Sequence, residues 1–142
     1  MRFLLDVNVL AALSFPDHEF QGRAHSWFLR EPGRLWATCA LTQAGFLRVA
    51  TQAFGSSRVA VREVLAGFEK DCQSPHHERW PVEADLRDLS DSIWARLIRL
   101  NQITDMQLLM LAHRHKGQLA TFDAGIRELA AGTRYANSLL LL

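Results

Sequence analysis

Short apolar runs alternate along the chain with longer segments of helical periodicity. An apolar run of about four to eight residues between turn-forming residues is typical of a buried strand. Such runs predict strands at residues 2–5, 34–41, 118–122 and 137–142. Residues 73–82 lack a regular pattern, so we predict a loop there with a short edge strand over residues 78–81.

Apolar residues that recur every three or four positions predict the helices. The predicted helices span residues 19–30, a segment from Thr42 onward, and residues 56–72, 83–101, 104–117 and 125–130. Ser56 or Ser57 is a natural N-cap for the third helix, and Thr104 for the fifth, which Gly117 would end. In the helix over 83–101, Leu86, Leu89, Ile93, Leu97 and Leu100 form the apolar face and Asp85, Asp88 and Asp91 face water.

The alternation of strands and helices predicts an α/β fold. Strands that alternate with helices in sequence form a mostly parallel sheet with helices packed on its faces. We therefore expect a three-layer α/β/α sandwich with a mostly parallel central sheet. The 142 residues form one domain on length alone, so a single domain over residues 1–142 is predicted.

Composition and charge indicate where in the cell the protein is expected, but they do not indicate its function. Apolar residues make up 49% and charged residues 22% of the chain, as in an ordinary globular protein. The net charge of +1 neither favours nor excludes nucleic acid as a partner. No segment has the apolar length of a membrane span or the pattern of a signal peptide. We expect a cytoplasmic protein with two reduced cysteines and no membrane partner.

Three aspartates carry the candidate chemistry. Asp6 and Asp123 each follow a predicted strand, and ligands bind at the carboxyl ends of the strands of open parallel sheets. Asp105 follows Thr104 at the predicted start of a helix, which is normally presented at the same edge. Two carboxylates about 4 Å apart repel by about 4 kcal/mol at an effective dielectric constant of about 20. A hard divalent ion, Mg²⁺ or Mn²⁺, would relieve that repulsion and leave positions open for a phosphate oxygen and a water.

Each of these aspartates also has an ordinary structural interpretation. Asp6 and Asp123 could each form a turn or cap a helix, and Asp105 could be a favourable charge at a helix N-terminus. Composition and spacing alone leave both interpretations open.

Three segments carry a resemblance to a known family. They are "LLDVNVLAAL", "ATCALTQAGFLRVAT" and "ITDMQLLMLAHRHKGQLATFDAGI", and they are spread over the chain almost end to end, with little contribution from residues 55–80. They resemble the motifs of the PIN-domain ribonucleases, specifically the VapC-type toxins of bacterial toxin–antitoxin pairs. The resemblance implies a metal-dependent endoribonuclease that cleaves RNA by metal-activated water. It further implies that Asp6, Asp105 and Asp123 surround one or two Mg²⁺ ions, and that the protein is a homodimer inhibited by a small antitoxin.

One residue departs from the family pattern, and three others are candidate accessory residues. The second motif of the family usually carries a glutamate where this chain has Gln43, which keeps a carbonyl oxygen but loses the charge. Asn8 matches the polar position after the first acid. Thr121, two residues before Asp123 on the same strand, could point its hydroxyl at the site. Arg48, on the same predicted helix as Gln43, could contact phosphate.

Two other function classes remain open on the sequence. One is an RNA-binding or antitoxin-binding protein that Gln43 makes catalytically weak or inactive. The other is a phosphotransferase with Asp6 as its nucleophile, since "DVNVL" distantly resembles the opening motif of the haloacid dehalogenases. That family has a second aspartate where Asn8 stands, which counts against it.

Overall fold

A five-stranded parallel sheet forms the centre of the molecule. The computed structural model describes residues 1–54 and 61–142, and Phe54 only in its backbone. The strands are β1 (Phe3–Leu5), β2 (Trp36–Cys39), β3 (His77–Trp80), β4 (Gln118–Thr121) and β5 (Leu139–Leu141). Their order is β3-β2-β1-β4-β5, and every neighbouring pair is parallel. The predicted strands are confirmed, including the edge strand near residues 78–81.

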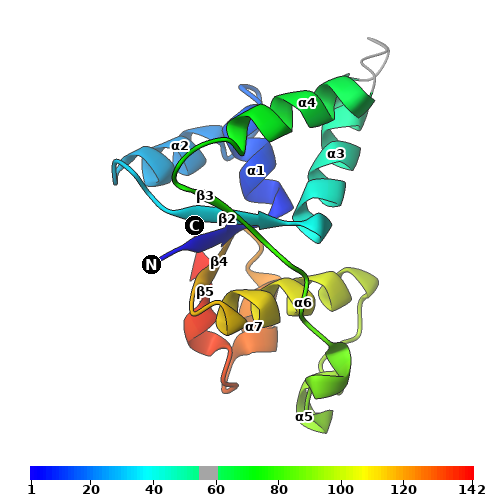
Figure 1. The fold of residues 1–142 in the computed structure, drawn as a ribbon. Helices are drawn as coiled ribbons and strands as arrows, with labels where there is room; N and C mark the ends of the chain where they lie inside the picture. Colours follow the sequence, from blue (N-terminus) through cyan, green and yellow to red (C-terminus); the bar gives the residue numbers. More distant parts are fainter. Residues whose placement is uncertain (55–60) are drawn as a thin grey trace.

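Helices cover both faces of this sheet (Figure 1). The α-helices of the described residues are α1 (Val7–Ser14), α2 (Gln21–Leu29), α3 (Ala40–Phe54), α4 (Val61–Asp71), α5 (Asp91–Trp94), α6 (Leu100–Arg114) and α7 (Gly125–Ala130). Helices α1 to α4 lie on one face, and α5 to α7 lie on the other. The predicted three-layer α/β/α sandwich is confirmed.

Alternation along the short strands supplies the core on both faces. Phe3 and Leu5 of β1 pack in the cluster that includes Val9 and Leu10 of α1, whereas Leu4 packs among the buried residues of α6. Successive side chains of a strand point to opposite faces, so three apolar residues in a row are buried on both sides. Because β1 is central, the residue that follows it stands at the middle of the sheet edge.

Helix α1 has no counterpart in the predicted elements. Its residues Val9, Leu10, Ala11 and Ala12 are all buried, so the segment shows no polar face. A helix covered on all sides loses the apolar periodicity on which the sequence interpretation depends. Asp6, the N-cap, is its clearest sequence signal.

The predicted continuous helix over residues 83–101 is wrong. A 3₁₀ turn over Leu86–Asp88 and the short α5 replace its first part, with extended backbone at Leu89. The Asp85 carboxylate accepts the backbone N–H of Arg87, a local bond that competes with a regular helix. Four members of the predicted apolar face, Leu86, Leu89, Ile93 and Leu97, do contribute to the core, but Leu100 is 89% exposed.

Helix α6 begins four residues earlier than predicted, so Thr104 is not its cap. Arg99 is extended, and the side-chain oxygen of Gln102 accepts the backbone N–H groups of Ile98 and Arg99. Asp105 consequently lies inside the helix, in its second turn. Its interpretation as a charge at the helix N-terminus is therefore wrong.

Gly117 is required by close packing rather than by the end of the helix. Helix α6 ends at Arg114, and Lys116 adopts the left-handed backbone conformation with φ of 53°. A Cβ on Gly117 would lie 2.6 Å from the carbonyl oxygen of Arg2 and 2.8 Å from the Trp80 ring. Only a glycine allows this approach of the turn to β1 and β3.

Three further expectations have mixed outcomes. Helix α3 begins at Ala40, two residues before the predicted Thr42. The caps predicted at Ser56 and Ser57 fall outside the described residues. Among residues 1–54 and 61–142, no helix is both long and apolar enough to cross a membrane.

Candidate active site

The pairing of β1 with β4 brings Asp6 and Asp123 to the same edge of the sheet. Leu5 lies opposite Ala120, and the backbone N–H of Asp6 donates to the Ala120 carbonyl over 3.0 Å. Asp6 follows β1 directly, and Asp123 comes two residues after the end of β4. The expectation that these two strands are parallel neighbours is confirmed.

The Asp6 carboxylate is buried and held by three donors. Its Oδ1 accepts the backbone N–H of Val7 over 2.6 Å. Its Oδ2 accepts the Thr121 hydroxyl over 2.6 Å and the Asn8 amide over 3.1 Å. Asp6 therefore caps α1, as its structural interpretation predicts, and it is also fixed in one orientation with only 8% of its surface exposed.

Thr121 and Asn8 tie the ends of β1 and β4 together. The Thr121 hydroxyl oxygen accepts the Asn8 amide and the backbone N–H of Asp123, both over 3.0 Å. The Asn8 carbonyl oxygen accepts the backbone N–H of Phe122 over 3.2 Å. Thr121 does point its hydroxyl at Asp6, as the period of two along the strand predicts. This network makes the edge rigid at Asp6.

The side chain of Asp123 stabilises the turn that leads into α7. Its Oδ1 accepts the backbone N–H of Gly125 over 2.8 Å, at the start of α7. This bond is typical of an aspartate that stabilises a turn by bonding the backbone two residues ahead. The other carboxylate oxygen, Oδ2, does not take part in this turn.

Asp105 completes a group of three interacting carboxylates. Its side chain is half-buried, and burial, followed by the negative charges of Asp6 and Asp123, raises its pKa to about 7. The pKa of Asp6 is also raised, mainly by burial and further by Asp123, against the lowering effect of its hydrogen bonds. The fold thus brings all three sequence-predicted aspartates within electrostatic reach of one another.

The chemistry of this group fits a hard divalent cation, although the ligands are not closed around one position. The negative charges of Asp6 and Asp123 raise the pKa of Asp105, and that of Asp123 raises the pKa of Asp6, so a nearby positive charge would stabilise this group. Over the described part of the chain, no three His, Cys, Asp or Glu side chains stand as a ready-made ligand set. Magnesium does not need one, because it usually binds one or two carboxylates and keeps several waters.

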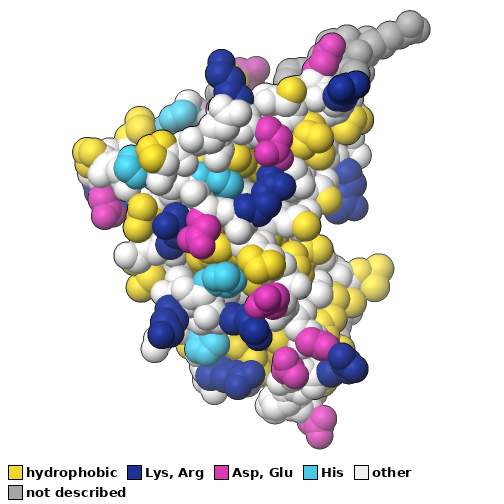
Figure 2. Space-filling model, viewed as in Figure 1, with side chains coloured by type: hydrophobic (Ala, Val, Ile, Leu, Met, Phe, Trp, Pro, Cys, Tyr) yellow, Lys and Arg dark blue, Asp and Glu magenta, His cyan; other side chains and the backbone are white. Residues whose placement is uncertain are grey.

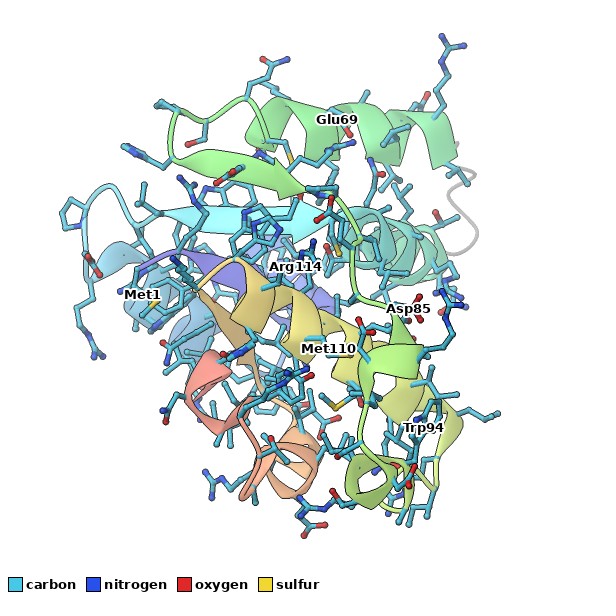
Figure 3. The ribbon with its side chains drawn as sticks, turned by 60° about the horizontal axis from the view of Figure 1, so that its bottom comes forward. Met1, Glu69, Asp85, Trp94, Met110 and Arg114 are labelled. Carbon is cyan, nitrogen blue, oxygen red and sulfur yellow. The ribbon has the colours of Figure 1, made fainter. Side chains whose placement is uncertain are left out.

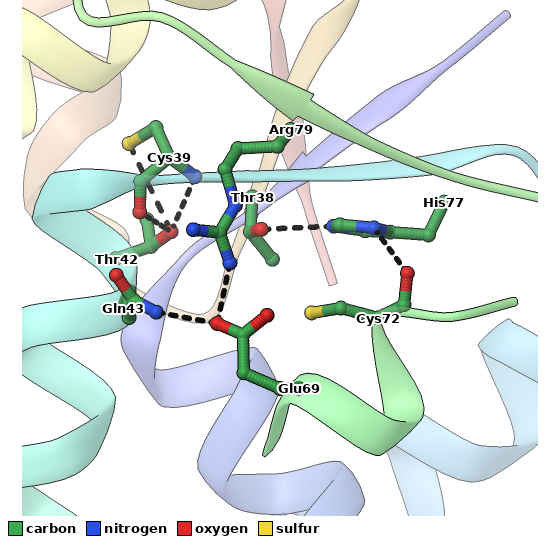
Figure 4. Close-up of polar contacts among 8 residues, drawn as sticks. All are labelled: Thr38, Cys39, Thr42, Gln43, Glu69, Cys72, His77 and Arg79. Atoms are coloured by element: carbon green, nitrogen blue, oxygen red, sulfur yellow. Dashed lines mark hydrogen bonds and ion pairs between the residues drawn. The ribbon is translucent and has the colours of Figure 1, made fainter. Parts of the chain in front are cut away.

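The side chain of Gln43 bonds Glu69, whereas its position in the family motif suggests a place with the acids of the site (Figure 4). Its side-chain amide donates to Oε1 of Glu69 on α4 over 2.7 Å, and Arg79 of β3 bonds the same oxygen over 2.6 Å. Sequence reasoning missed Glu69 and Arg79. No local signal could find them, because Gln43 and Glu69 are 26 positions apart and belong to different helices.

Arg48 lies on α3 with an exposed side chain. Its contact with phosphate stays a prediction.

Comparison with known proteins identifies the family that this chain matches. Residues 3–132 match the family model described as PIN domain. Ribonuclease VapC44 of Mycobacterium tuberculosis is 39% identical over 126 residues, which cover 89% of either chain. Ribonuclease VapC39 of the same organism is 33% identical over 141 residues, covering 92% of this chain and 95% of the relative. Ribonuclease VapC38, also from M. tuberculosis, is 38% identical over 133 residues, with 89% of each chain covered.

Proposed function

The chain belongs to the PIN-domain family, among its VapC-type ribonuclease toxins, and on this premise we propose that Asp6, Asp105 and Asp123 form the active site of its metal-dependent endoribonuclease activity. The assignment is supported by the electrostatic interaction of Asp105 with Asp6 and Asp123, two residues that follow neighbouring strands at the carboxyl edge of the sheet. It is also supported by the hydrogen bonds that hold Asp6 to Thr121, Asn8 and Val7. That edge is where open α/β sheets bind their ligands.

The three carboxylates have different roles in this proposal. Asp6 accepts three hydrogen bonds, which fix its carboxylate in place to hold a cation. Asp105 accepts a proton from the attacking water, since its half-buried carboxylate lies within electrostatic reach of the other two. Asp123 contributes the carboxylate oxygen that its turn leaves available.

Mg²⁺, with Mn²⁺ as a substitute, is the cofactor that this donor set fits. When bound, such an ion polarises a phosphate oxygen and lowers the pKa of a water. Asp6, Asp105 and Asp123 would hold it, and Thr121 and Asn8 would orient Asp6 toward it. Gln43 is a candidate accessory residue: its amide nitrogen donates to Glu69, and its neutral carbonyl oxygen is not used in that bond.

RNA is the proposed substrate and a cognate small antitoxin the proposed protein partner, in keeping with the ribonuclease toxins that the chain resembles. A location in the cytoplasm follows from these two partners.

A homodimer is also proposed. Large apolar side chains are exposed around α5 and the start of α6, namely Trp94, Ile98, Leu100 and Ile103. Figure 2 shows apolar side chains gathered at this side of the molecule, and Figure 3 places Trp94 on the far side of the sheet from Glu69. Exposed apolar patches of this kind mark protein–protein contacts.

Cleavage of labelled RNA tests the proposed active site. The purified protein is expected to cut RNA with Mg²⁺ or Mn²⁺ and to stop when EDTA is added. Asp6→Asn should abolish cleavage, because it removes a buried charge that the site is built to hold, whereas Asp88→Asn, an exposed change, should not. RNA that is bound but left intact by the unmodified protein would instead support the binding-only alternative.

A further inference from the structure

A polar bridge joins α3, α4 and β3. It consists of Gln43, Glu69 and Arg79, with Gln43 and Arg79 both donating to Oε1 of Glu69. Figure 4 shows the three side chains converging from their separate elements. Glu69 thus connects the first turn of α3 to α4 and to the edge strand.

The charge of Glu69 determines which way the Gln43 amide points. A carboxylate only accepts hydrogen bonds, so the amide must present its nitrogen to Glu69 and turn its oxygen away. A glutamate at position 43 would set two carboxylates against each other at this spacing. The bridge therefore requires one neutral and one negative residue at these two positions.

The same turn of α3 presses against the residue that holds Asp6. A Cβ on Gly45 would lie 2.5 Å from Cγ2 of Val7, so α3 and the start of α1 are in direct contact. The backbone N–H of Val7 donates to Asp6 Oδ1 over 2.6 Å. Gln43 and Gly45 are two residues apart on the helix, so they face different neighbours. Gln43 bonds Glu69 of α4 and Gly45 packs against Val7 of α1, so this turn of α3 is held between α4 and α1.

From this chain of contacts we infer that Glu69 is a positioning residue for the acidic site. Its bond to Gln43 holds the first turn of α3 in position. Gly45 of that turn packs against Val7, and the Val7 N–H bonds the Asp6 carboxylate, so the position of α3 determines the position of that carboxylate. The inference rests on the proposed function, because it assumes that Asp6 belongs to the active site.

The test compares Glu69→Ala and Glu69→Gln with Glu83→Gln. Glu83 forms an ion pair of similar exposure with Arg114, 3.0 Å long, and does not touch Gln43, so it is a matched control. Because exposed ion pairs add little stability, all three variants should remain folded. We expect Glu69→Ala to lower RNA cleavage roughly ten- to a hundredfold, as small displacements of catalytic groups do. Glu83→Gln should cleave like the unmodified protein.

The amide resonance of Val7, measured by NMR on the metal-free protein, reports on the site without any activity. It should shift in Glu69→Ala, since the Val7 N–H bonds Asp6 directly, and stay in place in Glu83→Gln. An unchanged Val7 resonance together with unchanged cleavage in Glu69→Ala would overturn the inference.

Exchanging the two residues tests whether the bridge itself matters. Gln43→Glu alone should impair cleavage, because two carboxylates then meet. Gln43→Glu combined with Glu69→Gln restores one amide facing one carboxylate, and we expect it to recover most of the cleavage and the Val7 resonance. A double variant no better than the worse single variant would contradict the inference.

The outcomes separate this inference from the proposed function. If Asp6→Asn still cleaves RNA, the active-site assignment fails, whatever Glu69 does. If Asp6→Asn is inactive while Glu69→Ala matches the unmodified protein in cleavage and in the Val7 resonance, only the role of Glu69 fails.

Discussion

Thr121 donates its hydroxyl proton to Asp6 over 2.6 Å, across 115 positions of sequence. This bond closes the junction between two neighbouring parallel strands at the point where both deliver a carboxylate. It lies in the buried part of the sheet edge, where a hydrogen bond to a charged group counts for more than it would in water.

Thr121→Val should therefore destabilise the protein by about 1.5–3 kcal/mol, the usual contribution of a hydrogen bond to a charged group. Asp6 loses a donor, and the backbone N–H of Asp123 loses its acceptor. Urea unfolding measures the change. Thr121→Ser keeps the hydroxyl and should recover most of it, and Thr51→Val, which removes a hydroxyl bonded only to a helix carbonyl, is the control. Equal losses in Thr121→Val and Thr51→Val would contradict this account.

The metal-free protein should lose stability as pH rises from about 4 to about 7. Asp105 has its pKa raised from 3.8 to about 7 in the folded state, so in this window the folded chain retains a proton that the unfolded chain has released. After discounting for solvent screening of a half-buried group, the loss is about 1–2 kcal/mol. Thermal unfolding in EDTA at a series of pH values measures it. Asp105→Asn should flatten the slope relative to Asp88→Asn, and parallel curves for the two variants would argue against the shifted pKa.

Mn²⁺ or Mg²⁺ should raise the melting temperature of the protein. A ligand at about 100 times its dissociation constant adds about 2.7 kcal/mol when it binds only the folded state. Asp6→Asn should remove the rise, and Asp88→Asn should keep it. Identical melting curves in EDTA and in millimolar Mn²⁺ would count against a cation at the three aspartates.

Gly45→Ala should destabilise the protein by about 1–3 kcal/mol, because the added methyl group overlaps Val7 and must push α3 from α1. Gly67→Ala is the matched control on α4, where nothing lies within 4 Å of the new Cβ. That change should instead stabilise the helix by about 0.5–1 kcal/mol. Urea unfolding distinguishes the two, and similar effects at both glycines would disprove the close contact.

The acidic edge was predictable from sequence because each of its parts has a local signal. Asp6 and Asp123 each follow a short apolar run, and Thr121 stands two positions before Asp123, so the period of the strand places its hydroxyl. The parallel sheet then brings the ends of both strands to one edge. Asp105 does interact electrostatically with Asp6 and Asp123, but the expected reason was wrong, since it lies in the second turn of α6 and not at its start.

What escaped prediction depends on contacts between distant residues or on competition within a segment. The Gln43–Glu69 bond joins two helices whose sequences give no sign of each other. The helix expected over residues 83–101 had an apolar stripe, but side-chain bonding by Asp85 and the extended Arg99 divide it. Periodicity records which residues are buried, and it does not record where the backbone turns between them.

The central place of β1 also has a consequence for synthesis of the protein. Phe3 pairs with Trp36 on one side and with Gln118 on the other, so both neighbours of β1 are translated after it. Asp6 obtains its Thr121 donor only after the ribosome has passed residue 121 and released that segment. Contacts of such long sequence separation form late in folding. A nascent chain of this protein therefore lacks an assembled acidic site until Thr121 and Asp123 have been translated.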